Sequence, residues 1–259
     1  MIRSLCFGLV AFASLSAGVS SAVLAEGDNG VYELRIYTCE EGKLPALHER
    51  FRNHTMRIFE KHGMKNIGYW TPTDGPLSEN TLVYMIRHES REAAAESWKA
   101  FGADPEWQAV AKESREKDGK ILAKRPEVTY LTLTEFSPEV SELDAGSVFE
   151  LRTYTTNPEK LDDLHTRFHD HTLALFKRHG MTNLWYFTPQ DEERQQNTLV
   201  YFLSHKSREA AGESWKGFQA DPEWQAARNA SEADGPILAK APDRMYLKLT
   251  DYSPRSAGN

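Results

Sequence analysis

The sequence lacks the short motifs that identify several classes of enzyme and metal-binding protein. Among its 259 residues there is no HExxH and no pair of CxxC motifs, which argues against a zinc site. It also contains neither a glycine-rich phosphate loop nor a G-x-S-x-G nucleophile motif. The only cysteines are Cys6 and Cys39, and Cys6 lies in a predicted N-terminal signal. The mature chain therefore keeps one cysteine and cannot form an intramolecular disulfide.

The chain also lacks an excess of positive charge. Its 31 lysines and arginines are outnumbered by 38 aspartates and glutamates, which gives a formal net charge of −7. No run of like charges offsets this balance. Because neutralising phosphates requires a basic face, the composition excludes a nucleic-acid-binding protein.

Apart from its beginning, the chain has no apolar run of membrane-spanning length. Residues 1–25 combine a short basic start, an apolar stretch from Leu5 to Leu15, and small residues before Ala22 and Ala25. This pattern predicts a cleaved secretory signal peptide, a secreted or periplasmic protein, and no stable membrane span after cleavage. The alternative is an N-terminal membrane anchor, for which the apolar stretch is short.

The most informative feature is an internal repeat. The segment 96–108 (ESWKAFGADPEWQ) returns 117 residues later as 213–225 (ESWKGFQADPEWQ). The same offset holds without a gap from Val31 to Ala109, and roughly three positions in five are identical between the copies. We therefore expect a first unit at 31–138, a linker at 139–147 and a second unit at 148–254.

Each unit has the same predicted order of strands and helices. In the first unit these are a strand at 31–38, a helix at 43–62, strands at 64–72 and 81–88, helices after Ser90 and Asp104, and a strand at 128–136. The order β-α-β-β-α(α)-β is ferredoxin-like and gives a four-stranded antiparallel sheet with helices on one face. The bare face must be covered. We predict an α+β fold in which the two units cover each other, sheet against sheet, as an intrachain pseudo-dimer.

Three segments resemble one known family. They are the strand at 32–37 (YELRIY), the helix ending in His62-Gly63, and the tryptophan-containing segment 97–107, and they resemble the NIPSNAP domain in both units. The resemblance implies a dimeric α+β barrel, a group that also includes cofactor-free monooxygenases and haem-degrading enzymes. The family itself has no agreed reaction. Its animal members are associated with mitochondria, but the predicted secretory signal means that no mitochondrial role is transferred here.

The charged face of the first strand supplies the candidate ligand-binding residues. Glu33, Arg35 and Tyr37 alternate with apolar residues that we expect to meet the helices, so we predict that they point into the space between the two sheets. There they could hold the carboxylate or carbonyl of a small ligand; the alternative is an ion pair that only satisfies itself. The matching residues of the second unit are Glu150, Arg152 and Tyr154.

Further candidates come from the first helix and the second strand of each unit. His54 and His171 share the apolar stripe of the first helix, where each is either a hydrogen-bonded core residue or a general base or haem ligand. Tyr69 and Tyr186 each lie on a strand beside another aromatic residue, Trp70 or Phe187, and whichever member of the pair faces the barrel would line any cavity.

Three functions remain open from sequence. The first is a protein that binds a small, partly apolar molecule in the cleft between the units. The second is a cofactor-free oxygenase or a haem-handling enzyme, which rests on the fold alone. The third is a protein-partner-binding module whose contact surface is formed by the tryptophan helices. Cofactor, ligand and any oligomer beyond the internal pair are not assigned.

Overall fold

The computed structural model describes residues 30–140 and 142–256. The predicted signal peptide at 1–25 lies outside the described residues. Within the described part, no helix is both long enough and apolar enough to cross a membrane.

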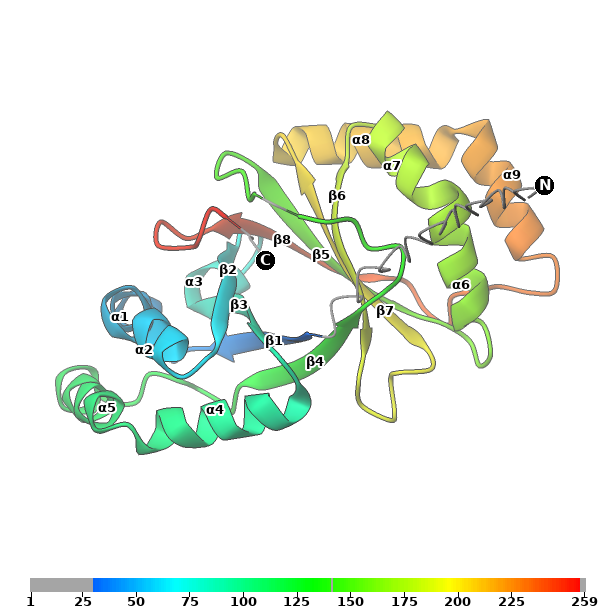
Figure 1. Cartoon of the computed structure of the whole chain (residues 1–259). Coiled ribbons are helices and arrows are strands. Elements are labelled where there is room, and N and C mark those ends of the chain that lie inside the picture. Colours follow the sequence, from blue (N-terminus) through cyan, green and yellow to red (C-terminus); the bar gives the residue numbers. More distant parts are fainter. Residues whose placement is uncertain (1–29, 141, 257–259) are drawn as a thin grey trace, which may run out of the picture.

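The two units contain the same succession of strands and helices, except that a short helix, Leu77–Asn80, occurs in the first unit and has no counterpart among the described residues of the second (Figure 1). The elements of the first unit are β1 (Val31–Thr38), α1 (Leu44–Arg50), η1 (Phe51–Thr55), α2 (Met56–Lys61), β2 (Lys65–Pro72), α3 (Leu77–Asn80), β3 (Thr81–His88), α4 (Arg91–Ala103), α5 (Pro105–Asp118) and β4 (Glu127–Leu133). Those of the second unit are β5 (Val148–Thr155), α6 (Leu161–Arg167), η2 (Phe168–Thr172), α7 (Leu173–Arg178), β6 (Thr182–Pro189), β7 (Thr198–His205), α8 (Arg208–Ala220), α9 (Pro222–Ser231) and β8 (Asp243–Leu249).

Local capping explains where the paired helices of each unit begin. The Ser90 hydroxyl accepts a hydrogen bond from the Ala93 amide at 3.1 Å, and the Asp104 carboxylate accepts one from the Glu106 amide at 2.8 Å. Pro105 follows Asp104 at the first helical position, where its missing amide donor has no cost. The second unit repeats both caps with Ser207 and Asp221.

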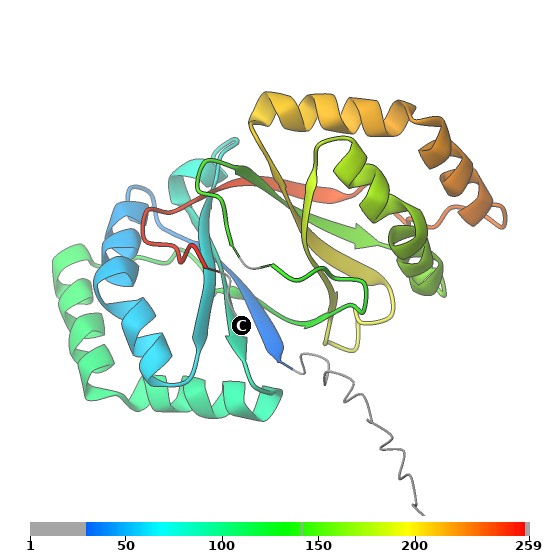
Figure 2. The same ribbon diagram turned by 45° about the horizontal axis from the view of Figure 1, so that its top comes forward.

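The eight strands form one closed barrel in the order β1-β3-β2-β8-β5-β7-β6-β4. Within each unit the first strand pairs with the third and fourth strands, and every pairing is antiparallel. The fourth strand of each unit also pairs with the other unit, because β4 lies beside β6 and β8 lies beside β2 (Figures 1 and 2). The predicted α+β fold and internal pseudo-dimer are therefore confirmed, and the contact between units includes shared backbone hydrogen bonding.

The segments that follow β4 and β8 continue onto the opposite unit. Phe136 packs in the helix-side core of the second unit, and Tyr252 packs in that of the first. The Tyr252 hydroxyl lies 2.7 Å from Nδ1 of His48. The segment expected to be a polar linker also contributes Leu143 to the barrel core. The units are thus joined by side chains as well as by strands.

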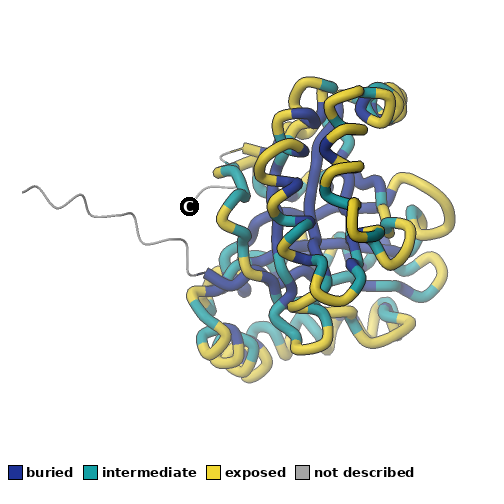
Figure 3. Tube along the Cα trace, turned by 90° about the vertical axis from the view of Figure 1, so that its right-hand side faces the viewer, coloured by how far each residue is buried: buried dark blue, intermediate teal, exposed yellow. Residues whose placement is uncertain are grey.

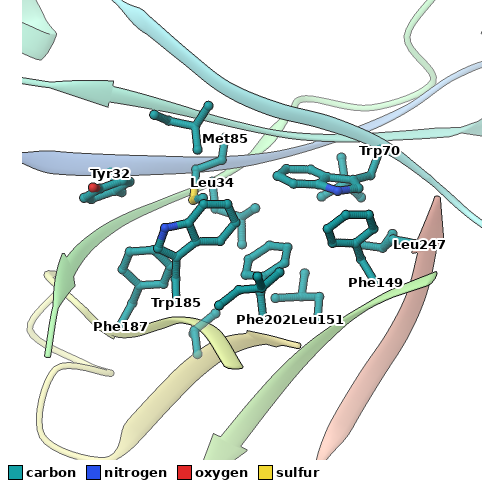
Figure 4. Packing of buried hydrophobic residues seen from close by; sticks show 14 of the residues in the cluster. Tyr32, Leu34, Trp70, Met85, Phe149, Leu151, Trp185, Phe187, Phe202 and Leu247 are labelled. Atoms are coloured by element: carbon teal, nitrogen blue, oxygen red, sulfur yellow. The ribbon is translucent and has the colours of Figure 1, made fainter. Parts of the chain in front are cut away.

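The barrel interior is filled by apolar side chains from both units (Figure 4). Two positions in matching strands show how the halves complement each other. Gly68 leaves room for the Trp70 ring, which would lie 2.2 Å from a Cβ at that position. The second unit has Trp185 and Phe187 at these two places, and both rings are buried. The large ring therefore comes from a different position in each half.

This interior corrects the prediction for the charged face of the first strand. Tyr32 and Leu34 face the barrel, whereas Glu33 and Tyr37 lie on the opposite face, under the helices of the first unit. The prediction that Glu33, Arg35, Tyr37 and their copies Glu150, Arg152, Tyr154 point between the two sheets was wrong. A period of two separates two faces but does not say which face the helices cover. On the helix side the Glu33 carboxylate finds hydrogen-bond partners in His88 and Trp98, whereas the barrel interior is lined mainly by apolar side chains.

Helices cover the outer face of each unit's sheet, and the burial pattern follows this layering (Figure 3). The helix-side core of the first unit includes Phe51, Phe59 and Phe101, and that of the second unit includes the equivalent phenylalanines. Among the described residues there are therefore three apolar cores: the barrel, and one core between sheet and helices in each unit.

The fit between Gly68 and Trp70 is testable by a double-mutant cycle. We expect Gly68→Ala to lower the free energy of unfolding by about 1–3 kcal/mol, because the added Cβ overlaps the Trp70 ring. The loss should be smaller in a Trp70→Phe background, with a coupling energy of about 0.5–3 kcal/mol in urea denaturation. Gly102→Ala is the control, since no atom lies within 4 Å of its added Cβ. Equal costs in both backgrounds would contradict the fit between Gly68 and the Trp70 ring. Separate unfolding transitions for the two halves would contradict the shared barrel.

Candidate functional site

The outer face of β5 carries a buried charged cluster. The Glu150 carboxylate, fully buried, accepts hydrogen bonds from Nη1 of Arg152 at 2.6 Å and from Nε1 of Trp215 at 2.8 Å. The oxygen that accepts from Trp215, Oε2, also lies 2.9 Å from Nε2 of His205. The Arg152 guanidinium stacks 4.1 Å from the Trp215 ring centroid, a cation–π contact. One carboxylate thus fixes an arginine, a histidine and a tryptophan from three elements.

The first unit repeats the cluster around Glu33. Nη1 of Arg35 donates at 2.6 Å, Nε1 of Trp98 donates at 2.7 Å, and Nε2 of His88 lies at 2.8 Å from the carboxylate. The Arg35 guanidinium lies 4.2 Å from the Trp98 ring centroid. The duplication shows that the cluster belongs to the architecture of the unit, where it ties the first strand to the third strand and to the first long helix.

Hydrogen bonding decides the charge of these carboxylates. Burial raises the pKa of Glu150, but the hydrogen bond from His205, the positive charge of Arg152 and the hydrogen bond from Trp215 more than offset it, so the pKa lies below its ordinary value. Glu33 follows the same pattern, with burial opposed by His88, Arg35 and Trp98. Both groups are therefore carboxylates, each beside a permanently charged guanidinium.

Some polar atoms of the clusters have no partner among the described residues. They are Nε of Arg35 and Arg152 and Nδ1 of His88 and His205. A neutral histidine whose Nε2–H donates a hydrogen bond to a carboxylate has a free acceptor at Nδ1. Unpaired buried polar atoms are uncommon in native proteins, and each cluster holds two of them beside its ion pair.

A cavity of about 780 Å³ opens beside the cluster of the second unit, between β5 and the helices α6 to α9. We call it the aromatic cavity. Its wall includes the rings of Tyr154, Phe168, Trp215 and Trp224 together with Arg152. This volume lies within the range of ordinary small-molecule sites.

The polar end of the aromatic cavity carries more positive than negative charge. Arg167 and Arg228 line it with Arg152, against one carboxylate, Glu232. Arg167 is buried, donates to Glu232 at 3.1 Å, lies 5.2 Å from the Trp224 ring centroid, and has an Nε without a partner. Such a wall suits a ligand that combines an aromatic body with a carboxylate or carbonyl.

Two sequence differences accompany the cavity in the second unit. The helix α9 ends at Ser231 after 10 residues, whereas α5 of the first unit has 14 residues. By the repeat offset, Arg228 stands where the first unit has Ala111. A shorter helix leaves the space beside η2 less covered, and the arginine adds charge to its rim.

The predicted ligand-binding residues divide into two groups. Arg152 and Tyr154 line the aromatic cavity, and Glu150 holds Arg152 in place. Tyr69 and Tyr186 are instead fully buried in the helix-side cores, where each stacks on the tyrosine of the neighbouring strand at 5.3 Å and 5.2 Å. Their hydroxyls donate to Asn66 and Asn183. Tyr186 lies in the core under the aromatic cavity and Tyr69 in the equivalent core of the first unit, and neither lines this cavity.

The prediction that His54 and His171 lie on the buried stripe of the first helix was wrong. Each helix passes through a π-helical turn, η1 or η2, in which the residue that returns to the buried face is Thr55 or Thr172. His171 is exposed, and His54 lies at a small hollow beside Arg50. Neither histidine lines the aromatic cavity, so this cavity offers no support for a haem axial ligand from them.

Sequence analysis missed the histidines of the two clusters, and it missed Arg167 and Trp224 in the wall of the aromatic cavity. His88 and His205 end equivalent strands and are separated by the repeat offset, so duplication of a histidine inside a buried strand was an available signal. Arg167 and Trp224 are duplicated as well, as Arg50 and Trp107 in the first unit, but their place in the cavity wall depends on how α9 packs against α6. Trp107 and Trp224 are part-buried, and they stack on Phe101 and Phe218 at 4.4 Å. They therefore lie largely in the core.

Comparisons with known proteins agree with this architecture. The NIPSNAP family model matches residues 32–138 and 149–254. The fold is similar to a "putative monooxygenase" from Fusobacterium nucleatum subsp. nucleatum, with 12% identity, coverage of 87% of this chain and 94% of that chain, and a TM-score of 0.56. An anthrone oxidase-like protein gives 14% identity, coverage of 90% and 95%, and a TM-score of 0.55. Both define a shared fold of dimeric α+β barrel type.

Single-domain relatives match one unit at a time. A NIPSNAP family protein from Agrobacterium tumefaciens has 27% identity and covers 42% of this chain and 97% of its own length, with a TM-score of 0.37. Curated proteins give no match. The fold and the site thus define a tandem α+β barrel protein with a charged cluster on each helix side. The chain belongs to the NIPSNAP family.

The buried carboxylates predict how stability depends on pH. Because the pKa of Glu150 is lowered from its ordinary value of 4.5, its contribution to stability is present above the pKa of the unfolded chain and is lost as pH falls through the folded pKa. We expect Glu150→Gln to reduce the free energy of unfolding by about 3–5 kcal/mol near neutral pH, since it leaves Arg152 buried without its partner. Urea denaturation at several acidic pH values should show a shallower decline for the variant than for the wild type. Glu116→Gln, at an exposed site, is the control; parallel curves for Glu150→Gln and wild type would contradict this account.

Proposed function

We propose that this protein binds a small, partly apolar molecule bearing a carboxylate or carbonyl group in the aromatic cavity of its second unit. The observation that carries the proposal is the combination of aromatic walls with the buried Arg152, whose Nε has no partner in the described residues. The ligand's body would pack on Trp215 and Phe168. Its polar group would satisfy the arginine, which the Glu150 carboxylate already orients.

The proposed site is not the cleft between the two units that the sequence predicts, and it lies within the second unit. The barrel between them is filled by large apolar side chains, so the space available for a ligand lies between the sheet and helices of one unit. The ligand contacts Arg152, Trp215 and Phe168 have identical counterparts in the first unit. What differs is the shorter helix α9 and the added Arg228 of the second unit, and on this basis we expect one molecule per chain.

An enzymatic function stays a prediction of the fold alone. The two structures with similar folds have names that refer to a monooxygenase and to anthrone oxidase, but their identities of 12% and 14% transfer no activity. The wall of the aromatic cavity contains no histidine or cysteine among its described residues. A binding role needs no further group, and it is the function that these residues favour.

An extracytoplasmic location is part of the same proposal and rests on the sequence of residues 1–25. We expect the full chain, expressed in a Gram-negative host, to appear in the periplasmic fraction with an N-terminus just after Ala22 or Ala25. Mass spectrometry of the intact mature protein measures this. Recovery of the uncleaved chain from the cytoplasmic fraction would contradict a secretory signal, and recovery from the membrane fraction would favour the anchor.

The aromatic cavity is tested by calorimetric titration with 2-naphthoate, a planar aromatic carboxylate. We expect binding of one molecule per chain, because the probe offers a ring to Trp215 and a carboxylate to Arg152. Asn229→Trp should reduce the affinity at least tenfold by filling the cavity from the exposed face of α9. Lys112→Trp, on the exposed face of α5, is the matched control and should leave binding unchanged. Absence of binding at millimolar 2-naphthoate, or equal affinity in both variants, would overturn the proposal.

A further inference from the structure

A second cavity, of about 360 Å³, adjoins the aromatic cavity in the second unit. We call it the cationic cavity, because its described lining includes four positively charged residues and no carboxylate. The charged residues are Arg152, Arg208, Lys216 and Arg244. The two cavities share Arg152, Trp215 and Gln219 in their walls, in a chain whose net charge is −7.

The charges of the cationic cavity are only partly neutralised within the chain. Arg152 is paired with Glu150, and Arg208 reaches the exposed Asp74 of the first unit at 3.1 Å while its guanidinium lies 3.5 Å from the Tyr246 ring centroid. Lys216 and Arg244 are exposed, and neither forms an ion pair with the described residues. The cavity therefore keeps an excess of positive charge.

Strand pairing forces two of these arginines together. Arg152 on β5 is the direct cross-strand partner of Arg244 on β8, so both side chains emerge from the same face of the sheet. Like charges directly opposite each other destabilise an antiparallel pair. The equivalent pair in the first unit is Arg35 with Val128. The second unit thus carries a cation at a position where its copy has an apolar residue, and an anion between the two guanidiniums would remove the repulsion.

A glycine in α8 points to the same cavity. Gly212 lines it and lies inside a helix, where glycine costs about 1 kcal/mol relative to alanine. The first unit has Ala95 at this position. A Cβ added to Gly212 would meet no atom within 4 Å, so packing does not require the glycine. Its effect is to leave the cavity wider beside Arg152 and Trp215.

We propose that the cationic cavity is a binding site for a doubly charged oxyanion, either a phosphate group or a dianion of similar shape. Guanidinium groups match phosphate oxygens with paired hydrogen bonds, and Lys216 adds a third, mobile cation. Because the two cavities share walls, a ligand that fills both has an aromatic body and a phosphate group. This extended ligand rests on the proposed function, whereas the oxyanion site itself does not.

Calorimetric titration with 1-naphthyl phosphate, 1-naphthol and inorganic phosphate at constant ionic strength tests the site. We expect inorganic phosphate to bind once per chain and 1-naphthyl phosphate to bind at least tenfold more tightly than either fragment. Arg244→Val introduces the residue that the first unit carries at this position. It should lower the affinity for inorganic phosphate and for 1-naphthyl phosphate at least tenfold. Lys216→Gln should lower the phosphate affinity. The control is Lys99→Gln, the equivalent change in the first unit, which should leave the phosphate affinity unchanged.

A second variant separates binding from folding. Gly212→Ala should leave the midpoint of thermal unfolding unchanged or raise it, because alanine favours the helix. It should nevertheless lower the affinity for 1-naphthyl phosphate. Ala95→Gly in the first unit should leave phosphate affinity unchanged.

The outcomes distinguish the two proposals. If 1-naphthol and 2-naphthoate bind but inorganic phosphate does not, the oxyanion site is overturned and the aromatic cavity stands. If inorganic phosphate binds and the aromatic probes do not, the proposed function is overturned and the oxyanion site stands. Unchanged phosphate affinity in both Arg244→Val and Gly212→Ala would place the bound ion elsewhere and overturn the cationic cavity as its site.

Discussion

The structure depends on the shared pairing of the fourth strand of each unit. A four-stranded sheet with helices on one face leaves an apolar face that must be covered. Here β4 and β8 each pair with both units, so the two bare faces close around one core. The segments after these strands place Phe136 and Tyr252 in the opposite unit's helix-side core. Neither unit therefore has a complete set of backbone and side-chain contacts without the other.

This closure also explains why the candidate sites lie on the outside of the barrel. Interior positions of the two halves are coupled, because the Trp70 ring of the first unit packs against Phe149 and Phe202 of the second. The helix sides are separate cores, so residues there can change in one copy without disturbing the other. The Glu-Arg-His-Trp cluster is common to both, while Arg228, Arg244 and Gly212 occur only in the second unit. Three of the differences between the duplicated units thus lie around one pair of adjoining cavities.

Much of the fold could be predicted from the sequence, because periodicity, caps and duplication all report local structure. The strand at Val31–Thr38 and the caps at Ser90 and Asp104 followed from such signals. The site was harder to predict. Alternation in β1 separated Glu33 from Leu34 but could not show which face met the helices, since both faces are buried. The π-helical turn that moves His54 off the buried face has no signature in the apolar spacing, and the cavities depend on tertiary packing.

The central claim is that two units form one barrel whose strands are shared. Hydrogen–deuterium exchange of backbone amides in the β4–β6 and β2–β8 pairs measures this most directly. If the barrel is closed, the paired amides of residues 131–133 and 70–71 exchange only through global unfolding, at the rate of the central strands β3 and β7. Rapid exchange in these pairs, with protection retained elsewhere in each sheet, would show open edges and contradict the account.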